Sequence, residues 1–175
     1  MEKEQTAKQL DEMRTTGYRP TVIVCCIHEK KVLMLFKKDY RLWLLPQSGV
    51  DAKEDPVKIG LKEIKETLGA AFTKKCAKTA LYLGEDQVEF LPEKQTNEEM
   101  ATADGKAFKI IGKHYYFYAL ACETDKIDLG ETQYDEFYWF DSKPGLVLAS
   151  KIYQPGKRRI TMKALGLLQE KGLIS

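Results

Sequence analysis

The sequence lacks the features that mark several classes of protein. Its 28 basic and 26 acidic residues leave a formal net charge of only +2 in 175 residues. That balance is too small to predict nucleic-acid binding, so any such role would depend on local clusters. No apolar run approaches the roughly 20 residues that span a membrane, and residues 1–5 do not resemble a secretory signal peptide. We therefore expect a cytoplasmic protein with no membrane partner.

Cysteine is sparse and irregularly placed. Cys25 and Cys26 are adjacent, and Cys76 and Cys122 are each isolated. None of them has the spacing of metal ligands, and without an export signal they are not expected to form disulfides. The sequence therefore predicts four reduced thiols in the core or at the surface.

Length and composition predict a single globular domain. Hydrophobic residues make up 43% of the chain and charged residues 31%, and there is no repeat, low-complexity segment or interdomain linker. We expect residues 1–16 to form an N-terminal helical extension and residues 17–175 to form one domain.

Hydrophobic periodicity predicts alternating strands and helices. Strands are expected at 21–27, 32–36, 79–84, 87–91, 108–121 and 136–140, and helices at 2–14, 56–68, 142–149 and 157–171. Residues 92–107 are polar and are predicted to form a loop or a weakly ordered excursion. A mixed β-sheet with the 56–68 helix on one side and the last helix on the other is an α/β/α sandwich, which is the fold class we expect.

Residues 46–69 form the most informative stretch. Asp55 or Glu54 can cap a helix that begins at Pro56 and ends at Gly69. Its apolar positions, spaced by four, three and four, form one stripe: Val57, Leu61, Ile64 and Leu68.

Carboxylates occupy another face of the same helix. Glu63 and Glu66 are neighbours three residues apart, Thr67 lies beside Glu63, and Glu54 precedes the helix in the loop. Hard divalent cations prefer oxygen ligands of this kind. Spacing alone, however, favours an ordinary solvated helix face.

The whole stretch resembles the Nudix box. Matching positions hold in register without a gap, and they are Ser48, Glu54, Lys62, Glu63, Ile64, Glu66, Thr67, Gly69 and Ala70. Three of them depart from the family pattern: Ser48 replaces a glycine, Lys62 an arginine and Thr67 a glutamate.

The resemblance implies an α/β/α fold and hydrolysis of a pyrophosphate bond in a nucleoside diphosphate derivative. The family uses Mg²⁺ or Mn²⁺ with water as the nucleophile. It implies metal binding by Glu54, Glu63 and Glu66, and a catalytic part for Glu63, Glu66 and Lys62. Lys62 can supply charge but not the bidentate fork of arginine. Thr67 would be a neutral, weaker ligand than the glutamate it replaces.

A second resemblance concerns the bacterial RNA pyrophosphohydrolase and dinucleoside polyphosphate hydrolase branch. It rests on residues 17–20, Gly-Tyr-Arg-Pro, and on Trp43 with residues 46–50, Pro-Gln-Ser-Gly-Val. It implies substrate binding by four residues: Arg19, Lys37, Lys38 and Gln47. Lys113 also falls where the branch places a basic or polar residue. Solvated surface charge explains the basic residues equally well.

The same branch has a further glutamate that acts on the metal-bound water. The matching position here is Gln133, which cannot act as a general base. Glu131 is the expected substitute. The aromatic run at 114–118 is expected to pack in the core, and the cations at 157–159 suit either a solvated helix end or an anionic partner.

Two functions remain open. One is a metal-dependent Nudix hydrolase, of reduced activity, that acts on a nucleoside polyphosphate or a 5′-phosphorylated RNA end. The other is a catalytically silent Nudix-fold module that binds nucleotide or RNA or associates with the ribosome. Thr67 and Gln133 separate them, because an enzyme needs replacement carboxylates and a binding module does not.

Overall fold

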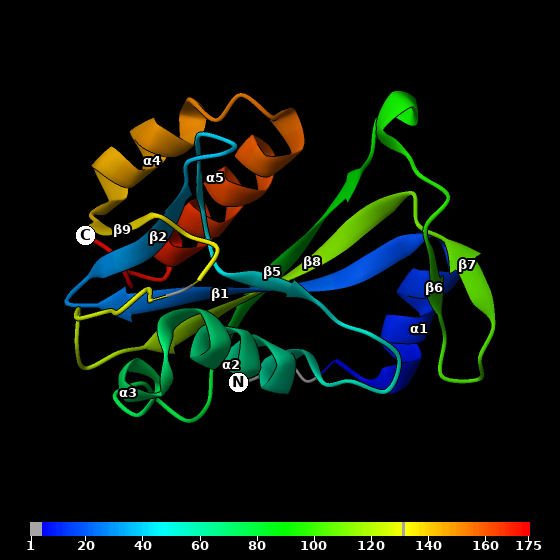
Figure 1. Cartoon of the computed structure of the whole chain (residues 1–175), viewed down its shortest axis with the longest axis horizontal. Coiled ribbons are helices and arrows are strands. Elements are labelled where there is room, and N and C mark those ends of the chain that lie inside the picture. Colours follow the sequence, from blue (N-terminus) through cyan, green and yellow to red (C-terminus); the bar gives the residue numbers. More distant parts are fainter. Residues whose placement is uncertain (1–4, 131) are drawn as a thin grey trace.

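A mixed β-sheet forms the centre of the molecule. The structure is a computed structural model and describes residues 5–130 and 132–175. Figure 1 shows the sheet between two helical layers. The seven strands are β1 (Tyr18–His28), β2 (Lys31–Lys37), β3 (Leu42–Leu44), β4 (Gln47–Gly49), β5 (Leu81–Glu89), β8 (Gly112–Ala121) and β9 (Glu136–Phe140). The predicted mixed α/β sandwich is confirmed.

Strand pairing places the first residues of β1 beside the first residues of β8. The order through the sheet is β3-β2-β1-β8-β5, with β4 also paired to β1 and β9 to β2. β1 and β8 run parallel in continuous register from Tyr18 opposite Gly112 to Ile27 opposite Ala121, and the other pairs are antiparallel. As a result, Arg19 of β1 lies directly opposite Lys113 of β8.

Helices cover both faces. Helices α2 (Pro56–Leu68) and α3 (Ala70–Thr73) lie on one face, and α4 (Ser142–Ser150) and α5 (Pro155–Glu170) lie on the other (Figure 1). Within the described ranges, no helix is long and apolar enough to cross a membrane.

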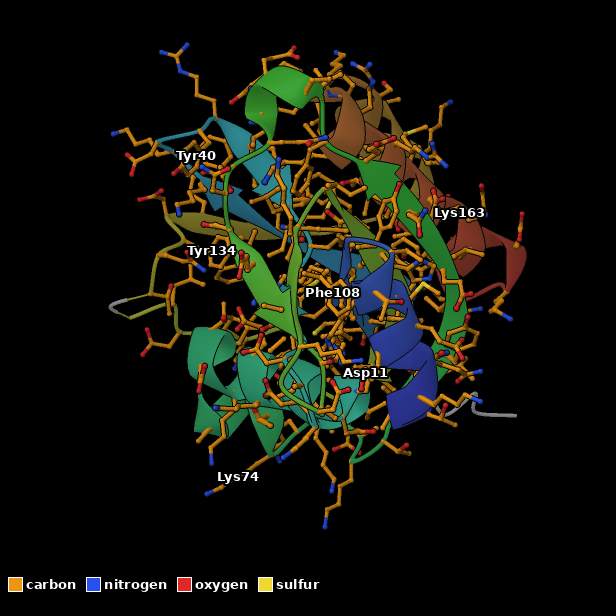
Figure 2. All side chains as sticks on the ribbon, turned by 90° about the vertical axis from the view of Figure 1, so that its right-hand side faces the viewer. Asp11, Tyr40, Lys74, Phe108, Tyr134 and Lys163 are labelled. Carbon is orange, nitrogen blue, oxygen red and sulfur yellow. The ribbon has the colours of Figure 1, made fainter. Side chains whose placement is uncertain are left out.

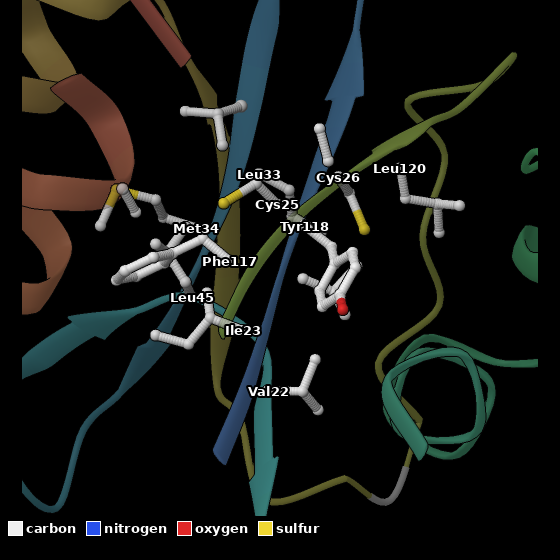
Figure 3. Close-up of a cluster of buried hydrophobic side chains, with 14 of the residues drawn as sticks. Val22, Ile23, Cys25, Cys26, Leu33, Met34, Leu45, Phe117, Tyr118 and Leu120 are labelled. Atoms are coloured by element: carbon white, nitrogen blue, oxygen red, sulfur yellow. The ribbon is translucent and has the colours of Figure 1, made fainter. Parts of the chain in front are cut away.

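The core forms because successive residues of the central strands point to opposite faces. Val22 and Tyr118 lie on the α2 side of the sheet, whereas Ile23 and Phe117 lie on the α5 side (Figure 3). All four are at most 2% exposed. The aromatic run at the start of β8 is therefore largely core, as its sequence predicts.

Helix α2 begins and ends where the sequence places it. The Asp55 carboxylate accepts the Lys58 N–H at 3.0 Å, and Gly69 ends the helix with φ +90°. Gly60 faces β1 so closely that a Cβ there would lie 2.7 Å from Val24 Cγ2. The centre of the buried face therefore runs through Gly60 and Ile64, and Val57 and Leu61 of the predicted stripe are only half-buried.

The segment 92–107 is ordered, contrary to the predicted loop or weakly ordered excursion. It contains a 3₁₀ turn, η1 (Pro92–Lys94), and strand β6 (Glu99–Ala101), which pairs with β7 (Ala107–Lys109). We call β6 and β7 the hairpin. The predicted strand 108–121 is thus divided between β7 and β8, because β7 pairs with β6 instead of joining the main sheet.

Helix α1 (Ala7–Thr15) packs at the same end of the molecule as the hairpin. Leu10 and Arg14 of α1 are each only 2% exposed. The Asp11 carboxylate accepts the Ala103 N–H at 3.1 Å, which joins α1 to the hairpin turn. Figure 2 looks onto this end, with Asp11 and Phe108 labelled.

Candidate functional site

A small pocket brings together several of the predicted site residues. Its volume is about 230 Å³, and it lies between the start of β1, the loop before α2 and one face of α2. The predicted residues that line it are Arg19, Glu54, Lys62, Glu63 and Glu66. We call it the carboxylate pocket. Residues from strand, loop and helix converge there because β4 runs beside β1 and leads directly into the loop that enters α2.

Glu63 is the half-buried carboxylate of the pocket. Burial raises the pKa of Glu63, a hydrogen bond from Thr67 lowers it in part, and the nearby charge of Glu66 raises it further. Thr67 Oγ1 donates that hydrogen bond to Glu63 Oε1 at 3.0 Å. Thr67 is only 6% exposed, so it supports Glu63 from beneath and does not line the pocket.

Glu66 and Lys62 occupy the exposed rim. Lys62 Nζ lies 3.8 Å from Glu66 Oε1, and both side chains are more than half exposed. An exposed pair of this kind contributes about 0.3–0.5 kcal/mol. Such a weak contact leaves both groups able to exchange partners when an ion or a phosphate enters.

The loop before α2 is held by its own hydrogen bonds. Glu54 Oε1 accepts the Asp51 N–H at 3.0 Å, and Arg19 Nη2 lies 3.3 Å from Asp51 Oδ1. Buried Arg14 of α1 donates to the carbonyl oxygens of Val50 at 2.8 Å and Asp51 at 2.9 Å. The sequence gives little sign of this role for Arg14, since an arginine in the last turn of a helix usually faces solvent.

Gly49 makes room for the Arg19 side chain. A Cβ at Gly49 would lie 2.6 Å from Arg19 Nε, well inside a van der Waals contact. Arg19 therefore crosses the backbone of β4 to reach the pocket. Ser48, at the glycine position of the family pattern, pairs with Val22 in the sheet and also lines the pocket.

Two further cations, on β8 and at the start of α5, lie outside the pocket. Burial, followed by the positive charges of Lys157 and Arg19, lowers the pKa of Lys113, and Glu98 opposes this shift. Burial and then Lys37 lower the pKa of Lys157 at the start of α5. Neither Lys113 nor Lys157 has an ion-pair partner within 4 Å among the residues that the structure describes.

The other cations at the start of α5 are already engaged. Arg158 Nη1 donates to Ile152 O at 3.0 Å, and Arg159 makes two hydrogen bonds to Asp86, at 2.8 and 3.0 Å. Of the basic run at 157–159, only Lys157 is left for an anionic partner among the described contacts.

Three predicted substrate-binding residues do not line the carboxylate pocket. Lys37 Nζ donates to Gln133 Oε1 at 3.3 Å and lies 4.9 Å from the centre of the Tyr40 ring. Lys38 is exposed in the turn that follows β2. Gln47 is half-buried in β4 opposite Ile23. Glu131, the predicted base, lies outside the described residues.

Tyr134 lies close to Glu63, but it belongs to no sequence motif that would have predicted this position. It is 8% exposed, and burial followed by the charge of Glu63 raises its pKa. It stands in the loop that precedes β9 and does not line the pocket, and only the fold brings it near Glu63.

No metal site is preformed in the described part of the chain. No group of three or more His, Cys, Asp or Glu side chains there is close enough to hold an ion. The carboxylates of Glu54, Glu63 and Glu66 do share one pocket, and Glu54 and Glu66 already accept other contacts. Their oxygens suit a hard divalent cation in kind.

Solved structures with a similar fold are hydrolases. The chain is similar to the dihydroneopterin triphosphate pyrophosphohydrolase of E. coli, with a TM-score of 0.58 and 15% identity over 85% of this chain and 97% of that one. It is also similar to an Ap4A hydrolase of C. elegans, with a TM-score of 0.56 and 11% identity over 87% and 96% of the two chains.

A hydrolase of Nitrosomonas europaea described as Nudix gives a TM-score of 0.56 and 11% identity over 90% of this chain and 92% of that one. No protein-family model and no curated protein sequence matches the chain. At these identities the likeness shows the fold, and the chain has the α/β/α fold of Nudix hydrolases.

Proposed function

We propose that the protein hydrolyses a pyrophosphate bond in a nucleoside polyphosphate or at a 5′-phosphorylated RNA end, with a divalent cation such as Mg²⁺ or Mn²⁺. The observation that carries the proposal is the convergence of Glu54, Glu63, Glu66 and Arg19 on one pocket, on a fold shared with a pyrophosphohydrolase and an Ap4A hydrolase.

The carboxylates fit a cation because one of them is half-buried and the other two share its pocket. Burial raises the pKa of Glu63 and the neighbouring charge of Glu66 adds a smaller increase, so the ionised form of Glu63 is disfavoured in the folded chain. A bound cation would favour that ionised form, polarise a phosphate oxygen and acidify a bound water. Glu54, Glu63 and Glu66 would hold it, with Glu66 exchanging its weak contact to Lys62.

The cationic residues of the pocket would bind the substrate, and a carboxylate would accept the proton from water. Arg19 and Lys62 line the pocket as cations and would contact the phosphate oxygens. We assign to the half-buried Glu63 the proton that water loses as its oxygen bonds to phosphorus and the bridging P–O bond breaks. Glu131 is the alternative acceptor that the sequence proposes.

The surrounding cations support a polyphosphate as the substrate class. Lys113 lies opposite Arg19 on the neighbouring strand. Besides burial, the charge of Lys157 lowers the pKa of Lys113. Two half-buried ammonium groups without ion-pair partners in the described part of the chain are costly. A phosphate chain longer than one unit would neutralise them.

A second candidate is a nucleotide-binding module without catalysis. Thr67 favours it, because the side chain at a metal-binding position of the family pattern is buried beneath Glu63 and contributes no carboxylate. This module would keep the cationic residues and bind the same phosphate chain.

One assay separates the two candidates. The protein is incubated with 5′-triphosphorylated RNA, diadenosine polyphosphates and nucleoside triphosphates, first in Mg²⁺ and then in Mn²⁺. The hydrolase predicts phosphate or pyrophosphate release that Glu63→Gln abolishes and that Glu170→Gln, an exposed change on α5, leaves intact. Binding of these ligands without turnover in either metal would establish the binding module and refute the hydrolase.

A further inference from the structure

A second cavity, of about 540 Å³, adjoins the carboxylate pocket. The two share Arg19 and Asp51 as wall residues, so they lie on either side of this ion pair. Its volume is within the range of about 300–1,000 Å³ that is typical of small-molecule sites. We call it the hairpin chamber, because β6 forms one of its walls.

The chamber walls are held in place by contacts between separate elements. Arg14 of α1 holds the loop wall through the carbonyl oxygens of Val50 and Asp51. Asp11 of α1 accepts hydrogen bonds both from Arg14, at 2.7 Å, and from the backbone of Ala103 in the hairpin turn, at 3.1 Å. Preorganised walls reduce the entropy that a ligand must lose on binding.

The chamber offers the mixture of contacts that a nucleoside requires. Met100 is the half-buried residue of β6, with exposed neighbours on either side, so its side chain faces the body of the molecule. With Val50 and Ile110 it supplies apolar surface, and Glu98 supplies hydrogen-bond acceptors. Asp51, Glu98 and Glu99 outnumber the two arginines of the lining, Arg14 and Arg19, and Arg14 already binds Asp11 and two carbonyl oxygens. This acidic excess disfavours a phosphate group more than a base and a sugar.

We propose that the hairpin chamber binds the nucleoside end of the ligand whose phosphate chain occupies the carboxylate pocket. This inference rests on the proposed binding of a nucleoside polyphosphate. The larger cavity of about 650 Å³ beside β9 shares no wall residue with the carboxylate pocket, and it is therefore not the continuation of that site.

The test fills the chamber without touching the pocket. Met100→Trp is compared with Lys106→Trp, which adds the same bulk to an exposed position at the hairpin turn outside the chamber. Calorimetry measures binding of GMP, AMP and inorganic pyrophosphate, and circular dichroism confirms that each variant is folded. We expect Met100→Trp to weaken mononucleotide binding at least tenfold and to leave pyrophosphate binding unchanged, and Lys106→Trp to alter neither.

Equal mononucleotide affinity in the wild type and in Met100→Trp would overturn the proposal that the chamber binds the nucleoside. A loss confined to pyrophosphate would overturn it as well. These outcomes are independent of catalysis. A protein that hydrolyses none of the tested substrates would refute the proposed hydrolase, and selective loss of mononucleotide binding in Met100→Trp would still establish the chamber.

A separate observation concerns two thiols at the other end of β8. Cys76, after α3, forms an isolated antiparallel bridge with Cys122, just beyond β8, and their sulfur atoms are 3.3 Å apart. Ala77 N–H donates to Ala121 O, and Glu123 N–H donates to Lys75 O, both at 2.8 Å.

Those flanking hydrogen bonds make the cysteines a non-hydrogen-bonded antiparallel pair. In such pairs the Cα atoms are about 4.5 Å apart, and disulfides accept Cα separations of about 4.4–6.8 Å. Cys76 is partly exposed, whereas Cys122 is 8% exposed. Cys76 is thus the thiol that an oxidant reaches first.

We propose that Cys76 and Cys122 form a reversible disulfide when the protein meets a small disulfide such as oxidised glutathione. The Cys76 thiolate attacks one glutathione sulfur and expels a glutathione thiolate. The Cys122 thiolate then attacks the Cys76 sulfur of the mixed disulfide and expels the second. One molecule of oxidised glutathione is reduced to two of glutathione as two protein thiols become one disulfide.

The reaction should accelerate with pH. The hydrogen bond to Cys122 and burial raise the pKa of Cys76, so little thiolate is present near neutrality. Cys122 also hydrogen-bonds to buried Cys26, which is the competing partner. The bridge from 76 to 122 would close a long loop containing β5, the hairpin and β8.

Mass spectrometry of peptides after exposure to oxidised glutathione at pH 8.5 tests this proposal. We expect a 76–122 disulfide, a higher midpoint of denaturant unfolding and reversal of both by a reductant. Cys25→Ala, a change at a buried thiol outside the pair, should oxidise like the wild type, and Cys122→Ala should not form the bridge. A stable glutathione adduct on Cys76, or a 26–122 bridge, would overturn the proposal.

Discussion

Thr67 donates a hydrogen bond to Glu63 Oε1 at 3.0 Å from one turn further along α2, and it does so from a nearly buried position. Thr67, one of three residues that depart from the Nudix pattern, therefore still acts on the site through Glu63. It lowers the pKa of that carboxyl against the larger effect of burial, and so it favours the ionised form that binds a cation.

The raised pKa of Glu63 predicts a pH-dependent loss of stability. Between the ordinary carboxyl pKa and the raised one, the folded chain retains a proton that the unfolded chain has released. Its contribution to the free energy of unfolding therefore falls as pH rises through that window. Glu63→Gln lacks this component. In urea unfolding without metal, the free energy of unfolding of Glu63→Gln should rise relative to that of the wild type as pH rises. That of Glu170→Gln should keep a constant difference from the wild type. Parallel curves for Glu63→Gln would contradict the assignment.

A carboxylate at position 67 should make stability depend on metal. Thr67→Glu places a second charge against Glu63 in a buried position, so we expect a loss of about 2–4 kcal/mol without metal. Mg²⁺ should restore more of its melting temperature than it adds to the wild type. Thr67→Val, which removes only the donor, should lose about 1 kcal/mol and gain no extra response to Mg²⁺. Equal responses of the melting temperature to Mg²⁺ in both variants would contradict the assignment of Glu63 to the metal site.

Gly49→Ala should weaken phosphate binding through Arg19. The added Cβ would collide with the guanidinium, so the side chain must leave its path into the pocket. We expect pyrophosphate affinity to fall about tenfold, the loss of one charged hydrogen-bonding group. Arg19→Gln should cost a similar amount, and the double variant should cost no more than either alone. Additive losses in calorimetry would show that Gly49 acts by another route.

Arg14→Met should destabilise the fold and loosen the loop before α2. The change leaves the carbonyl oxygens of Val50 and Asp51 without their buried donor, which should cost about 2–4 kcal/mol. Lys8→Met, an exposed change on the same helix, should cost less than about 0.5 kcal/mol. Denaturant midpoints measure both. Equal midpoints for the two variants would show that Arg14 does not brace the loop.

The sequence predicts α2 well because each of its signals is local. Asp55 caps it, Pro56 starts it and Gly69 ends it, as expected. The approach of Gly60 to Val24 depends on the packing distance between helix and strand, which hydrophobic periodicity does not encode. Segment 92–107 likewise makes a contact that local sequence does not encode, the hydrogen bond from the Ala103 N–H to the Asp11 carboxylate.

The candidate site is predicted only in part for the same reason. Glu54, Glu63 and Glu66 follow from the motif, and the structure brings them to one pocket. Arg14 holds the loop beside the pocket and Tyr134 lies near Glu63, both from distant segments, and neither belongs to a recognisable pattern. Lys38 carries the expected charge, but the turn after β2 leaves it exposed outside the pocket.

The rate of pyrophosphate-bond cleavage by the wild type and by Glu63→Gln, on one substrate at saturating Mg²⁺, tests the central claim most directly. We predict cleavage by the wild type and a loss of at least 100-fold in kcat in the variant, because Glu63 serves both the cation and the departing proton. Cleavage that continues at the wild-type rate in Glu63→Gln would contradict the claim that the carboxylate pocket is the active site.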